Sequence, residues 1–219
     1  MRVGRYGRAM TTPAAYPLRA ILAPLFVVQF LSWSGMFCLW IYAVPVITQF
    51  VYGASGDGQS YRAGLFAVSG CFALYALLAA CLAFALPRAI RRFGAGSVHG
   101  CALLIGSIGL SSLGLVTRPV LLIPAFAAIG VGWSSLSNIP YAIAGAAAPE
   151  GRGAHILRIF GFSTVAPQIV MTLGLAAASH IWFGDAVNRV MIAGGAMMAL
   201  AGLLTLALRA RFDVPQDDW

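Results

Sequence analysis

The sequence predicts an all-α membrane protein with six transmembrane helices, and three observations predict that fold class. First, 60% of the 219 residues are hydrophobic, only 9% are charged, and the mean hydropathy is +0.87. A soluble domain carries roughly 25% charged residues, so this chain lacks the charge to cover a surface in water. Second, six long segments without ionic side chains follow one another along the chain. Third, the arginines stand mainly between those segments, where loops are expected.

The charge-free segments have the length of membrane spans. They cover residues 20–56, 63–87, 93–117, 119–149, 159–184 and 190–208. A helix needs about 20 residues to cross a hydrocarbon core of ~30 Å, and one ionic residue at its centre costs roughly 2.5–3.5 kcal/mol. The segments also lack the polar–apolar alternation of barrel strands. We therefore predict helices near 21–45, 64–86, 98–117, 119–146, 158–180 and 188–208.

The distribution of arginine predicts how the chain is oriented. If both termini lie on one side, that side collects Arg2, Arg5, Arg8, Arg19, Arg88, Arg91, Arg92, Arg152, Arg158, Arg209 and Arg211. The other side holds Arg62, Arg118 and Arg189. Because cytoplasmic loops are rich in basic residues, both termini are expected in the cytoplasm, with the chain in the plasma or inner membrane. The expected organisation is a cytoplasmic segment 1–19, a six-helix bundle 20–211 and a cytoplasmic tail 212–219.

Several functional classes are not favoured by the sequence. The net charge of +8 is spread over short groups of arginine with no continuous basic face, so nucleic acid is not an expected partner. The four cysteines, at positions 38, 71, 81 and 101, lie in apolar segments without metal-ligand spacing and are expected to be buried. We expect no metal or other cofactor. An enzyme is not expected either, because no catalytic cluster or Gly-x-Ser-x-Gly motif stands at a helix end.

Glycine and proline inside the spans have two interpretations. The residues concerned are Gly106, Gly109, Gly114, Gly194, Gly195, Gly202, Pro45, Pro124, Pro140 and Pro167. Small residues allow helix backbones to approach closely in a membrane, whereas prolines free a backbone carbonyl and permit bending. The sequence alone leaves packing and hinge bending equally open.

Three stretches resemble a known family. They are Gln29-Phe-Leu-Ser-Trp-Ser-Gly-Met-Phe-Cys-Leu-Trp-Ile-Tyr-Ala-Val-Pro45, Gly130-Val-Gly-Trp-Ser-Ser-Leu-Ser-Asn-Ile-Pro-Tyr-Ala-Ile143 and Ile159-Phe-Gly-Phe-Ser-Thr-Val-Ala-Pro-Gln-Ile169. In this order and spacing they resemble the seventh, tenth and eleventh helices of major facilitator sugar symporters. The group most similar is that of sucrose and maltose transporters, of the glycoside–cation symporter and sucrose-carrier type. The resemblance extends from about Leu18 to Arg211.

Two loops add to the resemblance and supply candidate gating or topology residues. Pro87-Arg-Ala-Ile-Arg-Arg-Phe-Gly94 is similar to the basic turn between the second and third helices of a facilitator half, although it lacks that motif's Asp. Pro149-Glu-Gly-Arg-Gly153 is similar to the loop between the fourth and fifth helices. The resemblance assigns this cytoplasmic role to Arg88, Arg91, Arg92, Glu150 and Arg152. Pairing of Arg91 and Arg92 with Glu150 and simple solvated loop charges are both open interpretations.

The resemblance covers one half of a facilitator. Full transporters have two six-helix halves, with substrate held between them at the midplane. The chain would then be a C-terminal half whose residues 1–19 are the end of the loop joining the halves. It would transport a sugar by alternating access, and its partner would be a separate N-terminal half or a second copy of itself. A membrane structural or assembly subunit, or an inactive transporter fragment, is the alternative.

A sugar site requires aromatic rings for the C–H face and amides or hydroxyls for the sugar hydroxyls. Helical spacing places such side chains on one face in each of the three stretches. The residues predicted to bind substrate are Gln29, Trp33, Trp40, Asn138, Tyr141 and Gln168. The other interpretations are an interfacial aromatic belt for Trp40, packing for Trp33 and Trp133, and interhelical hydrogen bonds for Asn138 and Gln168.

Ion coupling has no candidate residue in this chain. No Asp or Glu lies in a predicted span, so a coupling carboxylate would belong to the other half. His99, His155 and His180 stand at predicted helix ends and are expected to lie at the membrane interface rather than to relay protons.

Overall fold

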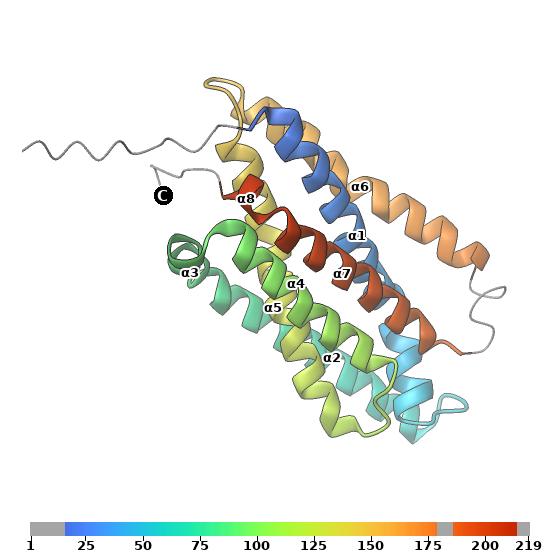
Figure 1. The fold of residues 1–219 in the computed structure, drawn as a ribbon. Helices are drawn as coiled ribbons and strands as arrows, with labels where there is room; N and C mark the ends of the chain where they lie inside the picture. The colour runs from blue at the N-terminus through green and yellow to red at the C-terminus, as the bar shows by residue number, and fades with distance from the viewer. Residues whose placement is uncertain (1–15, 179–185, 214–219) are drawn as a thin grey trace, which may run out of the picture.

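The computed structural model describes residues 16–178 and 186–213, and it builds them from helices joined by short connections (Figure 1). No strand occurs in these two ranges, so the predicted all-α fold class is confirmed. In chain order the elements are α1 (Leu18–Pro45), η1 (Val46–Val51), α2 (Gln59–Ala83), α3 (Leu86–Phe93), α4 (Ala95–Leu113), η2 (Pro119–Leu121), α5 (Leu122–Ala146), α6 (Gly153–Ala178), α7 (Arg189–Ala207) and α8 (Arg209–Phe212).

Six of the helical stretches are long and apolar enough to cross a membrane, as predicted. They are Leu18–Val51, Gln59–Ala83, Ala95–Leu113, Pro119–Ala146, Gly153–Gly174 and Arg189–Ala207. The first is longer than predicted because the π-helix η1 continues α1 beyond Pro45. The expected bundle limits, 20 and 211, lie within two residues of the first residue of α1 and the last of α8. Most of the two flanking segments falls outside the described residues.

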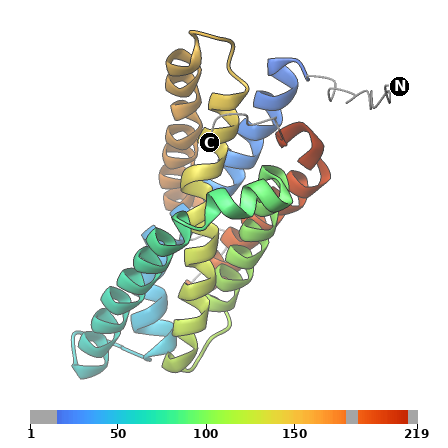
Figure 2. The ribbon, with the colours of Figure 1, turned by 90° about the vertical axis from the view of Figure 1, so that its left-hand side faces the viewer.

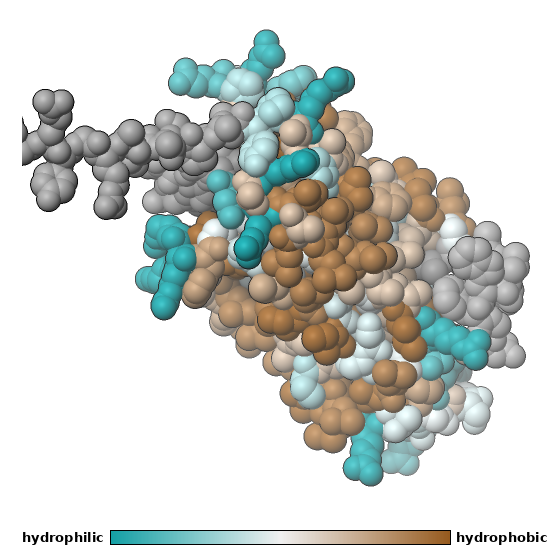
Figure 3. All heavy atoms as spheres, in the orientation of Figure 1, coloured by the Kyte–Doolittle hydropathy of each residue, from teal (hydrophilic) through white to brown (hydrophobic). Residues whose placement is uncertain are grey.

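The outer surface matches a membrane environment. Hydrophobic side chains form a broad band along the bundle, and hydrophilic residues gather at its two ends (Figure 3). Phe66 and Phe84 are 80% and 82% exposed, and Ile108 and Leu115 are comparably exposed. Such rings and aliphatic chains would be a liability in water, whereas lipid solvates them without cost.

The helix α4 lies at the centre of the packing. It packs most extensively on α7 and α5, while α1 packs on α7 and α6, and α2 packs on α5. The helix α6 lies at the outside of the bundle in both views (Figures 1 and 2), and α2 lies at the outside in Figure 2. They are also the two spans with the smallest buried share. The bundle therefore leaves two long helical surfaces, α2 and α6, largely uncovered by protein.

Glycines set the closest helix contacts, which supports the packing interpretation at these positions. A Cβ at Gly106 would lie 3.0 Å from the Cα of Gly132, where α4 crosses α5. At Gly109 it would lie 2.5 Å from the carbonyl oxygen of Ala125. A Cβ at Gly194 would meet Cys38, which joins α7 to α1. Backbones can approach this closely only where no side chain separates them.

Prolines occupy sites that tolerate a lost backbone hydrogen bond. Pro124 lies in the first turn of α5, where the amide has no helical partner in any case. Pro45 ends α1, and η1 follows it directly. Pro140 and Pro167 are inside helices and buried against the bundle. Inside the bundle, neighbouring helices can supply partners for the carbonyls that these prolines free.

The prediction that all four cysteines are buried is wrong for two of them. Cys38 and Cys71 are buried as predicted, but Cys81 and Cys101 are exposed on α2 and α4. Apolar sequence context could not separate these cases, because in a membrane protein apolar residues face lipid as often as the core.

The short helix α3 is an element that the sequence did not predict. Pro87 is its second residue, Gly94 follows its last residue, and none of its residues is buried. Gly94 has φ of +84°, a conformation that favours glycine, and it turns the chain directly into α4. The carboxylate of Asp213, just after α8, accepts a hydrogen bond of 3.0 Å from the backbone amide of Gly96. A residue near the end of the chain thus caps the N-terminus of α4.

The glycine contacts predict a clear difference between two matched substitutions. Gly109→Ala would place a methyl group against the Ala125 carbonyl, and moving either backbone would disturb the α4–α5 contact. We expect a loss of about 1–3 kcal/mol in stability, measured by thermal unfolding in detergent micelles. Gly70→Ala, on α2 with open space around it, is the control and should be neutral or slightly stabilising. Equal melting temperatures for the two variants would contradict the packing role.

The cap predicts that Asp213→Ala weakens the junction of α3, α4 and α8. Loss of a capping side chain costs about 0.5–2 kcal/mol, which a lowered melting temperature would report. Gly94→Ala should destabilise by a similar amount or more, because its φ is unfavourable and its Cβ would collide with the same carboxylate. Gly153→Ala, with open space around it, serves as the glycine control. An unchanged melting temperature for both Asp213→Ala and Gly94→Ala would rule out the cap.

Candidate functional site

An aromatic cluster joins α1 to α5 inside the bundle. The rings of Trp33 and Trp40, one above the other on α1, lie 5.5 Å and 5.3 Å from the ring of Trp133 on α5, with edge-to-face geometry. Trp33 and Trp40 are themselves 5.8 Å apart, and Phe37 lies 5.1 Å from Trp40. All four side chains are only partly buried. The structure thus brings the predicted aromatic face of the first span against the fourth span, and it adds Trp133 to the candidate site.

Gln29 lies one turn before Trp33 on the same face of α1, and its environment is unusual. Its side chain is completely buried, and neither its amide oxygen nor its amide nitrogen has a hydrogen-bond partner among the described residues. The indole nitrogen of Trp33 is also buried without a partner within that part of the chain. An unpaired buried polar group costs about 1–3 kcal/mol, so this amide is a feature that folding alone does not explain.

The register of the helices places further polar groups at the level of Gln29. Phe160 on α6 packs edge-on against Phe26 of α1 and Tyr141 of α5, with ring centroids 5.3 Å apart in both cases. The helices α1 and α6 run in the same direction (Figure 1), so three residues further Gln29 and Ser163 reach the same level. Ser163 is likewise buried, and its hydroxyl has no partner among residues 16–178 and 186–213.

The other predicted substrate residues divide between the interior and the surface. Tyr141 is half-buried in the contact with Phe160, while Asn138 and Gln168 are exposed. The amide nitrogen of Asn138 donates 2.7 Å to the carbonyl oxygen of Ser134 in its own helix, so it does not bridge helices through this bond. Gln29, Trp33, Trp40 and Tyr141 therefore lie along the α1–α5–α6 contact, whereas Asn138 and Gln168 are exposed.

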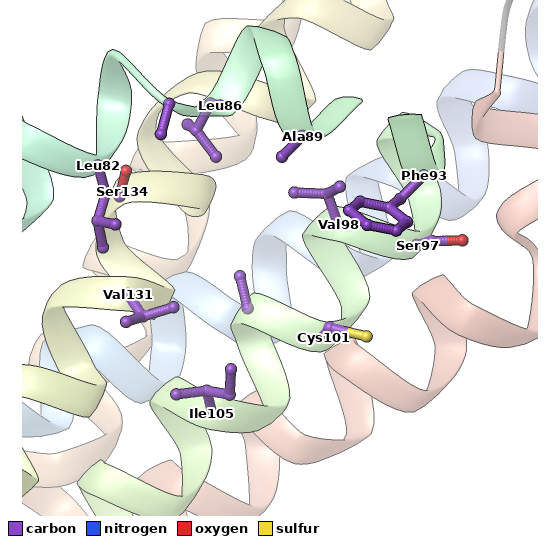
Figure 4. A pocket seen from close by; sticks show the side chains of 12 residues that line it. Leu82, Leu86, Ala89, Phe93, Ser97, Val98, Cys101, Ile105, Val131 and Ser134 are labelled. Atoms are coloured by element: carbon purple, nitrogen blue, oxygen red, sulfur yellow. The ribbon is translucent and has the colours of Figure 1, made fainter. Parts of the chain in front are cut away.

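A cavity that opens to the surface lies elsewhere in the bundle. It has a volume of about 400 Å³ and is lined by the end of α2, the short helix α3, and α4 and α5 (Figure 4), and some of its lining residues, such as Phe93 and Ile105, are exposed. Its walls are almost entirely apolar and include Leu86, Phe93 and Ile105. None of the six predicted substrate residues lines this cavity. The polar residues predicted in the first, fourth and fifth spans therefore do not converge on this space.

His99 corrects the expectation of an interfacial histidine. It stands in the second turn of α4 but is fully buried, with its Nδ1 2.7 Å from the hydroxyl of Ser135 on α5. This contact links the two helices at the centre of the packing. Burial was not predictable from its place near a helix end, because it results from the packing of α4 on α5. His155 is exposed, and His180 lies outside the described residues.

The predicted cytoplasmic residues all lie at one end of the bundle and are exposed. Arg88, Arg91 and Arg92 belong to α3, and Glu150 and Arg152 flank the turn before α6. The guanidinium of Arg92 lies 5.1 Å from the ring centroid of Phe93. Pairing of Arg91 or Arg92 with Glu150 stays a prediction.

Comparison with known proteins does not place the chain in a family. No protein-family model matches it, and a search of curated proteins found no match. The resemblance to sugar symporters therefore stays a prediction, and any function has to be argued from the arrangement of residues described above.

The unpaired amide of Gln29 predicts an unusual response to substitution. Gln29→Met keeps the side chain's length and removes both unpaired polar atoms, so we expect stability to rise by about 1–3 kcal/mol in detergent. Gln49→Met makes the same change at an exposed position of η1 and should have little effect. Thermal unfolding of the two variants measures the difference. A lower melting temperature for Gln29→Met would mean that the amide stabilises the fold after all.

Proposed function

We propose that the chain is the C-terminal half of a sugar transporter of the major facilitator type, which works by alternating access together with a second six-helix half. The substrate class is a glycoside similar to sucrose or maltose. The observation that carries the proposal is the unpaired, fully buried amide of Gln29 beside the Trp33–Trp40–Trp133 cluster.

The Gln29 amide and the tryptophan cluster together have the groups that bind a sugar. Aromatic rings pack against the apolar C–H face of a pyranose, and an amide supplies one donor group and one acceptor for its hydroxyls. The partly exposed tryptophans leave ring surface accessible next to the amide. A small shift of α1 against α5 would open Gln29 to a ligand, and its unpaired atoms would then gain the hydrogen bonds that they lack in this conformation.

The exposed polar residues support a partner half. Asn138 and Gln168 are exposed on α5 and α6, and both lie well inside spans where lipid would be a poor environment for an amide. A second half packed over these helices would enclose both side chains in a shared interior. In this arrangement all six predicted residues contribute to one site, with Gln29, Trp33, Trp40 and Tyr141 deeper and Asn138 and Gln168 at the junction.

Membrane orientation follows from the basic residues in the same proposal. The exposed arginines of α3, the turn before α6 and α8 lie at the end of the bundle where α1 begins. Arg62, Arg118 and Arg189 lie at the opposite end. The richer end would face the cytoplasm of a plasma or inner membrane. A coupling ion, where the transporter uses one, would be held by an acidic residue of the other half.

One observation favours a different class of function. The cavity described above is apolar and excludes the predicted substrate residues. A structural or assembly subunit of a membrane complex would need no polar cavity and would use the uncovered faces of α2 and α6 for contact with other subunits. The two proposals differ in whether this chain contributes to a substrate pathway.

Uptake measurements distinguish the two classes. Proteoliposomes would contain this chain, alone or together with the product of a neighbouring six-helix reading frame, and uptake of radiolabelled sucrose and maltose would be followed. We expect Gln29→Met and Trp33→Ala to lower uptake at least about five-fold, because each removes a sugar contact worth about 1 kcal/mol or more. Phe66→Ala, on the lipid-facing side of α2, is the control and should retain uptake.

Two results would contradict the transport proposal. One is uptake that survives both site substitutions at the level of the Phe66→Ala control. The other is the absence of saturable uptake of either sugar from both preparations, with the chain shown to be folded by its melting transition. The second result would favour the structural subunit.

A further inference from the structure

The apolar cavity lies beside a row of positive charges. Leu86, Ala89 and Phe93 of α3 line one wall, and Cys101 and Ile105 of α4 line another (Figure 4). With a volume of about 400 Å³ it falls in the range of cavities that hold small organic ligands. Hydroxyl groups come only from Ser97 and Ser134 among its lining residues. Its contents must therefore be mainly hydrocarbon.

The short helix α3 is amphipathic across this cavity. The residues at 86, 89 and 93 repeat at helical spacing and line the space, while Arg88, Arg91 and Arg92 are exposed on the remaining surface of the helix. No residue of α3 is buried in the bundle. Such a helix, with a basic face and an apolar face, suits the boundary between headgroups and acyl chains.

One contact places a positively charged side chain beside the cavity. The guanidinium of Arg92 lies 5.1 Å above the ring of Phe93, and that ring lines the cavity. The positive charge is therefore held at the mouth of an apolar space. Asp213, the carboxylate beside Gly94, is engaged by the amide of Gly96 at the start of α4. The exposed surface of α3 carries the three arginines Arg88, Arg91 and Arg92.

We propose that this cavity binds an acyl chain of an anionic phospholipid whose phosphate group lies against the arginines of α3. The cavity accounts for the chain, and the arginines account for the headgroup, because guanidinium groups hydrogen-bond phosphate oxygens in pairs. A zwitterionic lipid would supply the same hydrocarbon but would also bring a cationic group to a surface that is already positive. The site is independent of the transport proposal, because none of the predicted substrate residues lines it.

Native mass spectrometry of the purified full chain tests the headgroup. The protein in detergent would be mixed with equal amounts of phosphatidylglycerol and phosphatidylcholine of the same acyl composition. We expect preferential retention of one phosphatidylglycerol. The triple variant Arg88→Gln, Arg91→Gln and Arg92→Gln should reduce that preference at least ten-fold. The matched control, Arg62→Gln with Arg118→Gln and Arg189→Gln, removes the same charge from the opposite end and should retain it.

A second pair of variants tests the acyl chain. Ala89→Trp would fill the cavity and should lower the retention of both lipids several-fold, whereas Ala76→Trp adds the same ring to an exposed position of α2 and should not. Equal retention of the two lipids by the unaltered chain would overturn the proposal. The same conclusion would follow if the α3 triple variant matched its control, or if Ala89→Trp bound as much lipid as Ala76→Trp.

Discussion

The inability of hydrocarbon to hydrogen-bond determines most of this structure. Every polar group inside a span needs a partner within the protein, which requires helices for the backbone and nearby acceptors for side chains. Several serine and threonine hydroxyls follow this rule, whereas those of Ser134 and Ser163 are buried without a partner among the described residues. Ser32, Ser34, Thr48 and Thr205 each donate to the carbonyl of the residue four positions earlier in the chain, at 2.7–2.8 Å. These short side chains are satisfied within their own helix and place no demand on packing.

The same constraint removes the usual force that joins helices. Lipid is as apolar as leucine, so burial of leucine gains little, and close backbone contact becomes the main source of specificity. This explains why α4 is central. Its glycines at 96, 100, 106 and 109 allow α8, α7 and α5 to approach the backbone. The helices α2 and α6 have fewer such positions and pack at the edge.

These two rules explain which features could be predicted from the sequence. Six spans were predictable because charge is excluded from all of them, and helical spacing indicated that Trp33 and Trp40 share one face of α1. Whether an apolar or weakly polar residue faces lipid or protein was not predictable, because both environments accept it. The exposure of Cys101 and Asn138 and the burial of His99 could not be predicted for this reason. The helix α3 was missed because its eight residues are too few for a clear helical period in the sequence.

Gln29 differs from the hydroxyl residues in a way that bears on function. An amide has both donor and acceptor groups on a longer side chain, and the carbonyls of its own helix cannot satisfy both. At this fully buried position of α1, leucine or methionine would fill the space without leaving a polar group unpaired. The energetic cost of the glutamine is therefore a reason to look for a state in which its amide is paired. A helix interface that opens to admit a hydroxyl-rich ligand is one such state, and it would make the conformation described here the unliganded, closed one of the pair.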